Sequence, residues 1–216
     1  MFFELTDLLS CPRCGPAHGL ILLVEEVGDR RVRTGWLGCP HCRRDYRVSG
    51  GIADLRLDPN SRPEPKAPFE AEELALKVLA LSGVAEERTH LLLGERLAHV
   101  AADIAEMAPE LEIISFRCAP DPSPEKPGVS RILIDEGLPL VEYRLRAVAI
   151  APGAGGVNVA AAARRVAAGG RLVLFDAGAG DLEEAEREGM EIIAAEARTA
   201  VAERRGGSLP VAKLKG

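Results

Sequence analysis

The stretch THLLLGERLAHVAAD, residues 89–103, has the pattern of a buried strand, a turn and the start of a helix. Leucines fill positions 91–93, and apolar residues then recur at helical spacing from Leu97 to Ala108. An α/β domain that binds a nucleotide carries a glycine-rich loop at such a turn, because glycine lets the backbone approach the ligand. Here the turn contains one glycine, Gly94, followed by two long charged side chains. The stretch predicts the scaffold of such a domain without its loop.

Strands and helices alternate on both sides of this stretch. Five strands are expected, at 91–93, 111–116, 131–135, 146–151 and 171–175, and two closing strands at 190–195 and 199–203. Helices are expected at 71–81, 97–108, 157–168 and 181–188, with Gly169-Gly170 ending the third of them. This order predicts an α/β fold with a Rossmann-like, mostly parallel sheet that is covered on both faces.

Four of the five cysteines form two identical frames near the start of the chain. Cys11-Pro12-Arg13-Cys14 and Cys39-Pro40-His41-Cys42 are separated by 24 residues, of which 19–27 and 30–38 are expected to form a hairpin. Paired Cys-x2-Cys turns are typical of a tetrahedral zinc site with Cys11, Cys14, Cys39 and Cys42 as ligands. Four thiolates close the site, so the zinc is expected to be structural, and His18 and His41 are not expected to be ligands.

The residues around these frames resemble a known family. LTDLLSCPRC and LGCPHCRRDYRVSGGIADLR, within residues 2–57, resemble the small zinc-ribbon subunits that activate methyltransferases acting on tRNA, ribosomal RNA and translation release factors. Leu5, Leu8, Leu9, Tyr46, Gly51 and Ile52 match that pattern, and Ala53 replaces its usual proline. The resemblance implies a non-catalytic β zinc ribbon that adds a strand to its enzyme's sheet and covers apolar surface.

Composition and local sequence patterns indicate the domain organisation and exclude some classes of protein. The 216 residues carry a net charge of −6, which argues against a general nucleic-acid or membrane binder. We predict a zinc-ribbon domain at 1–57, a proline-rich linker at 58–68 and an α/β domain at 69–216. The first ten residues contain no basic residue, so no secretory signal is expected and the predicted location is the cytoplasm.

The second half, roughly residues 70–206, resembles a class I S-adenosylmethionine-dependent methyltransferase. The passage ARRVAAGGRLVL at 163–174 and the two closing strands carry this resemblance. The residues that bind the cofactor in that family are not matched in this sequence. The loop after the first strand keeps only Gly94, and Arg117 stands where an acidic residue would bind the cofactor's ribose. Four prolines between 119 and 128 exclude the helix expected after the second strand.

These departures predict a protein that works by binding and not by catalysis. We expect no catalytic and no cofactor-binding residues, because the positions for S-adenosylmethionine are not retained, and a protein partner: a methyltransferase, a translation-related protein or a second copy. His90, His99 and Cys118 are expected to be structural. An active methyltransferase with a divergent loop stays open. So does an RNA-binding ribbon that uses its seven arginines, Arg13, Arg30, Arg31, Arg33, Arg43, Arg44 and Arg47.

Overall fold

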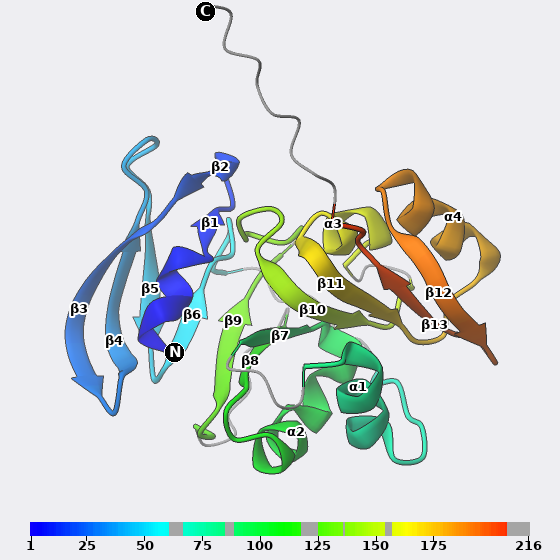
Figure 1. Cartoon of the computed structure of the whole chain (residues 1–216). Coiled ribbons are helices and arrows are strands. Elements are labelled where there is room, and N and C mark those ends of the chain that lie inside the picture. The colour runs from blue at the N-terminus through cyan, green and yellow to red at the C-terminus, as the bar shows by residue number, and fades with distance from the viewer. Residues whose placement is uncertain (61–66, 85–88, 118–124, 136, 154–156, 207–216) are drawn as a thin grey trace, which may run out of the picture.

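A computed structural model of the chain describes residues 1–60, 67–84, 89–117, 125–135, 137–153 and 157–206. Within these residues, one 11-stranded sheet runs through the molecule in the order β12-β13-β11-β10-β7-β8-β9-β6-β5-β4-β3 (Figure 1). The linker predicted at 58–68 lies partly outside the described residues. None of the described helices is long and apolar enough to cross a membrane.

The first 54 residues form a small β structure. It consists of the 3-10 helix η1 (Phe3–Asp7), β1 (Ser10–Cys11), β2 (Gly15–Gly19), β3 (Ile21–Gly28), β4 (Arg31–Gly38), β5 (Asp45–Ser49) and β6 (Ile52–Asp54). β3 to β6 form an antiparallel meander, and β1 pairs with β2. The predicted hairpin is confirmed, whereas η1, β2 and β6 were not expected.

The rest of the chain forms the α/β half. Its elements are α1 (Leu74–Ser82), β7 (His90–Leu93), η2 (Glu95–Val100), α2 (Ala101–Met107), β8 (Glu112–Arg117), β9 (Val129–Leu133), β10 (Leu145–Ile150), α3 (Val159–Ala163), β11 (Val166–Leu174), α4 (Ala179–Arg187), β12 (Glu191–Glu196) and β13 (Thr199–Glu203). β9, β8, β7, β10 and β11 are parallel, in the 3-2-1-4-5 order of doubly wound folds, and β13 and β12 close the sheet antiparallel. The predicted fold class is confirmed.

One predicted helix is wrong in its extent. The helix expected at 157–168 ends at Ala163, and β11 begins at Val166. The chain enters the sheet early because Leu145 donates its backbone N–H to the Arg165 carbonyl. Gly169 and Gly170 therefore lie within β11, where the pairing with β10 shifts register. A side chain at Gly170 would place its Cβ 2.8 Å from the Arg146 carbonyl oxygen, so this close approach requires glycine.

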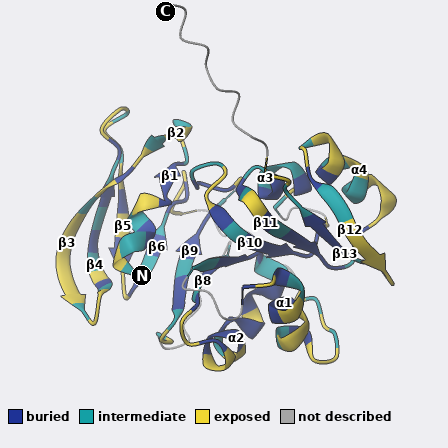
Figure 2. Ribbon diagram, in the orientation of Figure 1, coloured by how far each residue is buried: buried dark blue, intermediate teal, exposed yellow. Residues whose placement is uncertain are grey.

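The two faces of the α/β sheet are covered differently. On one face α1 and α2 pack on Leu91, Leu93 and Ile113. On the other, Leu92, Ile114 and their neighbours share a single core with residues of α3, α4 and the β structure, and the central strands are buried (Figure 2). Alternate residues of each strand thus face two separate cores.

The N-terminal segment takes a position that a crossover helix usually fills. The described residues between β9 and β10, at 134–135 and 137–144, contain no helix. Met1, Leu5 and Leu9 instead pack there, each with no exposed surface. Ser10 donates its backbone N–H to the Pro139 carbonyl at 2.9 Å, which ties this segment to the loop before β10. The N-terminal segment therefore completes the core of the α/β half.

The β structure also joins the α/β half through the sheet itself. β6 pairs in parallel with β9, with Ile52 opposite Arg131 and Asp54 opposite Leu133. Just beyond these strands, Asp135 accepts a hydrogen bond from the Leu57 backbone at 2.7 Å. The strand addition that the zinc-ribbon resemblance implies for a separate enzyme occurs here within one chain.

An ion pair at the opposite end of this junction is expected to stabilise the folded chain. Arg31 donates two hydrogen bonds to the Glu112 carboxylate, at 2.7 and 2.9 Å, and both side chains are at least four-fifths buried. A double-mutant cycle with alanine at both positions, followed by urea unfolding, should give a coupling of about 1–3 kcal/mol, as for charge-assisted bonds shielded from water. The exposed pair Arg33–Glu26 is the control, with an expected coupling below about 0.5 kcal/mol. Equal couplings in the two cycles would contradict this role for Arg31.

Gly35 provides a second test of the packing. In β4 it lies so close to β3 that an added Cβ would be 2.4 Å from the Leu23 carbonyl oxygen. Gly35→Ala is expected to lower the free energy of unfolding by about 1–3 kcal/mol, because backbone atoms must shift to accept the methyl group. Gly180→Ala in α4 is the matched control, since nothing lies within 4 Å of its added Cβ. A Gly35→Ala variant as stable as this control would contradict the close approach.

Candidate metal centre and cofactor crevice

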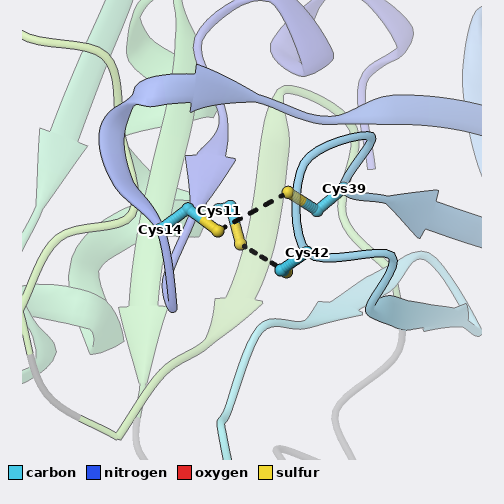
Figure 3. Close-up of side chains that lie close together, drawn as sticks. All are labelled: Cys11, Cys14, Cys39 and Cys42. Carbon is cyan, nitrogen blue, oxygen red and sulfur yellow. Dashed lines mark hydrogen bonds between the residues drawn. The ribbon is translucent and has the colours of Figure 1, made fainter.

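The four cysteines of the two frames meet at one point. Cys11 and Cys14 lie at the turn between β1 and β2, and Cys39 and Cys42 at the turn between β4 and β5 (Figure 3). The second turn is closed by two backbone hydrogen bonds at 2.9 Å, from Cys39 to the Arg44 carbonyl and from Arg43 to the Cys39 carbonyl. Two tight turns from distant parts of the β structure thus direct their thiols toward each other.

The sulfur positions suit a tetrahedral metal ion. All four Sγ atoms lie within 4.8 Å of one another, and the pairs Cys11–Cys42 and Cys14–Cys39 are 3.7 and 3.9 Å apart (Figure 3). A tetrahedron with zinc–sulfur bonds of about 2.3 Å has edges of about 3.8 Å. The cysteine cluster can therefore hold a metal ion. His18 and His41 do not belong to the cluster; their rings stack on each other, with centroids 4.3 Å apart.

The surroundings of the thiols favour a cation. Burial acts to raise the pKa of Cys11, but hydrogen bonds, first from the Tyr46 hydroxyl at 3.5 Å, lower it to about 7. Burial and the neighbouring cysteine thiols raise the pKa of Cys14 to about 12. Four crowded thiols cannot all ionise unless a cation lies among them, and a divalent metal ion supplies that charge.

The second candidate site is the crevice at the carboxyl ends of β7 and β10, where the direction of strand order changes. Ligands of doubly wound folds bind at this position. Gly94 follows β7 here, and a Cβ at Gly94 would lie 3.1 Å from the Ile150 side chain. Its role is therefore explained by the packing of two strand ends.

The Arg96 side chain lies beyond the carboxyl ends of β10 and β11. Its Nη1 donates to the Pro152 carbonyl at 2.9 Å and lies 3.4 Å from the Asp176 carboxylate. Its Nε donates to the Ala67 carbonyl at 3.3 Å, and its guanidinium lies 5.8 Å from the centre of the Phe69 ring. One arginine thus joins the ends of β10 and β11 to the segment that precedes α1. The sequence shows Arg96 in the loop but not the destination of its side chain.

Charged side chains at the neighbouring strand ends also form hydrogen bonds with backbone groups. Arg117, at the end of β8, donates to the Ala98 carbonyl at 3.3 Å, and Asp135, after β9, accepts hydrogen bonds from the backbone N–H groups of Leu57 and Asp58. Cys118 and residues 154–156 of the APGAGG loop lie outside the described residues. Among the described residues at these strand ends, Arg117 and Asp135 are therefore both engaged in contacts within the chain.

The two histidines of the α/β half lie apart from the cysteine cluster. His90 begins β7, at the end of the strand opposite the crevice, and burial lowers its pKa. His99 lies in η2, and Glu70 is 3.9 Å from its Nε2, a carboxylate neighbour that the sequence did not indicate.

Comparison with known proteins gives structural similarity only. The sequence matches no family model and no curated protein. Among solved structures, the antibiotic-resistance methyltransferase Kmr is similar, with 15% identity over 66% of this chain and 97% of that chain, at a TM-score of 0.44. A putative methyltransferase from Bacillus halodurans gives 16% identity over 56% of this chain and 70% of that chain, at 0.41. A probable spermidine synthase from Corynebacterium glutamicum gives 13% over 81% of this chain and 66% of that chain, at 0.32.

The fold assignment rests on the strand order and not on these similarities. Parallel strands in the order β9-β8-β7-β10-β11, closed by antiparallel β13 and β12, define a methyltransferase-like α/β fold. The chain joins this fold to a four-cysteine cluster that can bind a metal ion.

Proposed function

We propose that the chain is a zinc-binding protein whose methyltransferase-like domain is non-catalytic and acts by binding a partner protein. The observation that carries the proposal is the Arg96 side chain, which lies in the crevice and bonds to Pro152 and Asp176. A cofactor in this crevice would have to displace that guanidinium and leave Asp176 without this partner. Breaking such partly buried charged contacts costs more than it would at an exposed site.

The zinc ion is proposed to have a structural role and not a catalytic one. Four cysteine ligands leave no open position for a substrate, so the metal would hold the two turns together. Since β1 and β4 lead directly into the core that Leu9 and Leu37 share with the α/β half, an ordered ribbon would stabilise the whole chain. The ribbon would then serve its own domain in the way that the related subunits serve a separate enzyme.

This arrangement limits how a partner could be bound. β6 is paired on both sides, by β5 and by β9, and so has no free edge to offer to another sheet. The resemblance suggests a methyltransferase or a translation-related protein as the partner, with a second copy of this chain as the alternative. Any of these would have to contact a surface other than β6.

The thermal midpoint of unfolding tests whether the domain is non-catalytic. A ligand that binds the native state raises this midpoint, and at 100 times its dissociation constant it adds about 2.7 kcal/mol of stability. We expect no shift with S-adenosylmethionine or S-adenosylhomocysteine at millimolar concentration. A rise of several degrees with either compound would favour an active methyltransferase and overturn the proposal.

The contacts of the N-terminal arginines argue against the RNA-binding alternative. Arg30 pairs with Glu4, Arg31 with Glu112 and Arg33 with Glu26, so three of the seven charges are balanced within the chain. Binding to single-stranded RNA that weakens steeply as salt increases would favour that alternative instead.

A further inference from the structure

The acceptors around Arg96 form a site with a definite chemistry. The carbonyl oxygens of Ala67 and Pro152 and the carboxylate of Asp176 approach one guanidinium from three separate segments of the chain. Carbonyl and carboxylate oxygens accept hydrogen bonds and donate none when the acid is ionised. The group that fits among them is therefore a cation with several N–H donors.

Aromatic rings complete the site. The Phe69 ring lies 5.8 Å from the guanidinium carbon of Arg96, and its centre is 5.7 Å from that of Phe175, which is fully buried at the end of β11. Arg96 also accepts, through its backbone carbonyl, a hydrogen bond from the Phe69 N–H at 2.9 Å. An aromatic face beside a carboxylate is the usual environment for an organic cation.

Asp176 is held in place by contacts other than those with Arg96. Its backbone has a φ of 59°, in the left-handed region that aspartate tolerates better than most residues. Arg198 lies 2.9 Å from its second carboxylate oxygen and donates to its backbone carbonyl at 3.3 Å. The contacts with Arg198 therefore hold the carboxylate in position when the Arg96 side chain is removed.

We infer that the crevice contains a binding site for a small organic cation and that Arg96 occupies this site from within the chain. The inference rests on the proposed non-catalytic function, since it explains how a crevice without a cofactor stays filled. A guanidinium-sized cation carried by a small molecule would bind once the Arg96 side chain is shortened, because the acceptors remain in place.

The test uses N-ethylguanidinium, which has the atoms that Arg96→Ala removes, and N-ethylurea, its neutral counterpart of similar shape. By calorimetry on the full-length Arg96→Ala protein, we expect N-ethylguanidinium to bind about tenfold or more tightly than N-ethylurea, since only the cation forms charge-assisted bonds with Asp176. The wild-type protein is expected to bind neither compound. Adding Asp176→Asn to Arg96→Ala should bring the two affinities to within about twofold of each other.

Two results would overturn the inference: equal affinities of Arg96→Ala for the two compounds, or binding of N-ethylguanidinium by wild type as tight as by the variant. If Arg96→Ala unfolds, the midpoint of its unfolding is measured with each compound, and selective restoration by the cation supports the site whereas no restoration overturns it. Binding of S-adenosylmethionine by the wild-type protein tests the proposed function separately, so the two failures are distinguishable.

Discussion

Replacing Cys39 and Cys42 with serine is expected to abolish metal binding and to destabilise the whole chain. Structural zinc contributes about 10–16 kcal/mol in small zinc domains, as much as the whole stability of many globular domains. The residues around the site pack into the same core as the α/β strands, so the loss should spread beyond the ribbon. A net loss of about 5 kcal/mol would lower the unfolding midpoint by roughly 10–20 °C in a chain of this size.

Metal analysis and thermal unfolding together check this prediction. Wild-type protein purified without chelators should contain about one equivalent of zinc per chain, and the double variant should contain almost none. Cys118→Ser is the matched control, because it removes one thiol outside the two frames and should leave the zinc content unchanged. A wild-type zinc content below about half an equivalent, or an unchanged midpoint in the double variant, would count against a structural zinc site.

Deleting residues 1–57 is expected to leave the α/β half unable to fold into a soluble, cooperative structure. The deletion removes the strand that pairs with β9 and uncovers apolar residues of the shared core such as Leu92, Ile114 and Ile132. An open sheet edge beside exposed apolar surface promotes aggregation. The expected result is insoluble protein, or a soluble form without a cooperative unfolding transition in urea.

Restoring the ribbon as a separate chain is the control for this deletion. Residues 1–57 expressed together with residues 58–216 are expected to recover soluble protein, because the strand and core contacts can form between two chains as they do within one. The α/β half would not depend on residues 1–57 if residues 58–216 alone were soluble and unfolded cooperatively with the stability of the full chain.

Local patterns in the sequence predict much of the fold and of the metal centre. The spacing of the two Cys-x2-Cys frames indicates that the four cysteines form one cluster, and the buried apolar runs indicate the parallel strands. The pattern fails where the pairing of distant segments decides the structure. Gly169-Gly170 is typical of a helix end, yet contacts between β10 and β11 place both glycines in a strand.

The union of the two halves is the feature that the sequence could not predict. β6 has three residues, too few for a periodic pattern, and its pairing with β9 joins positions far apart in the chain. The N-terminal apolar residues indicate burial, but nothing local identifies the α/β sheet as the surface that covers them. Likewise, Arg96 is visible as a charged residue in a glycine-poor turn, whereas its contact with Asp176 depends on the finished fold.

The central claim is that Arg96 bonds to Pro152 and Asp176 near the position where doubly wound folds bind their ligands, and that the chain does not bind S-adenosylmethionine. Calorimetric titration of the full-length, zinc-loaded protein with S-adenosylmethionine, and in parallel with S-adenosylhomocysteine, tests this claim most directly. No saturable heat is expected with either compound at concentrations up to about 1 mM, the range of weak binding. Stoichiometric, saturable binding of S-adenosylmethionine by the wild-type protein would contradict it.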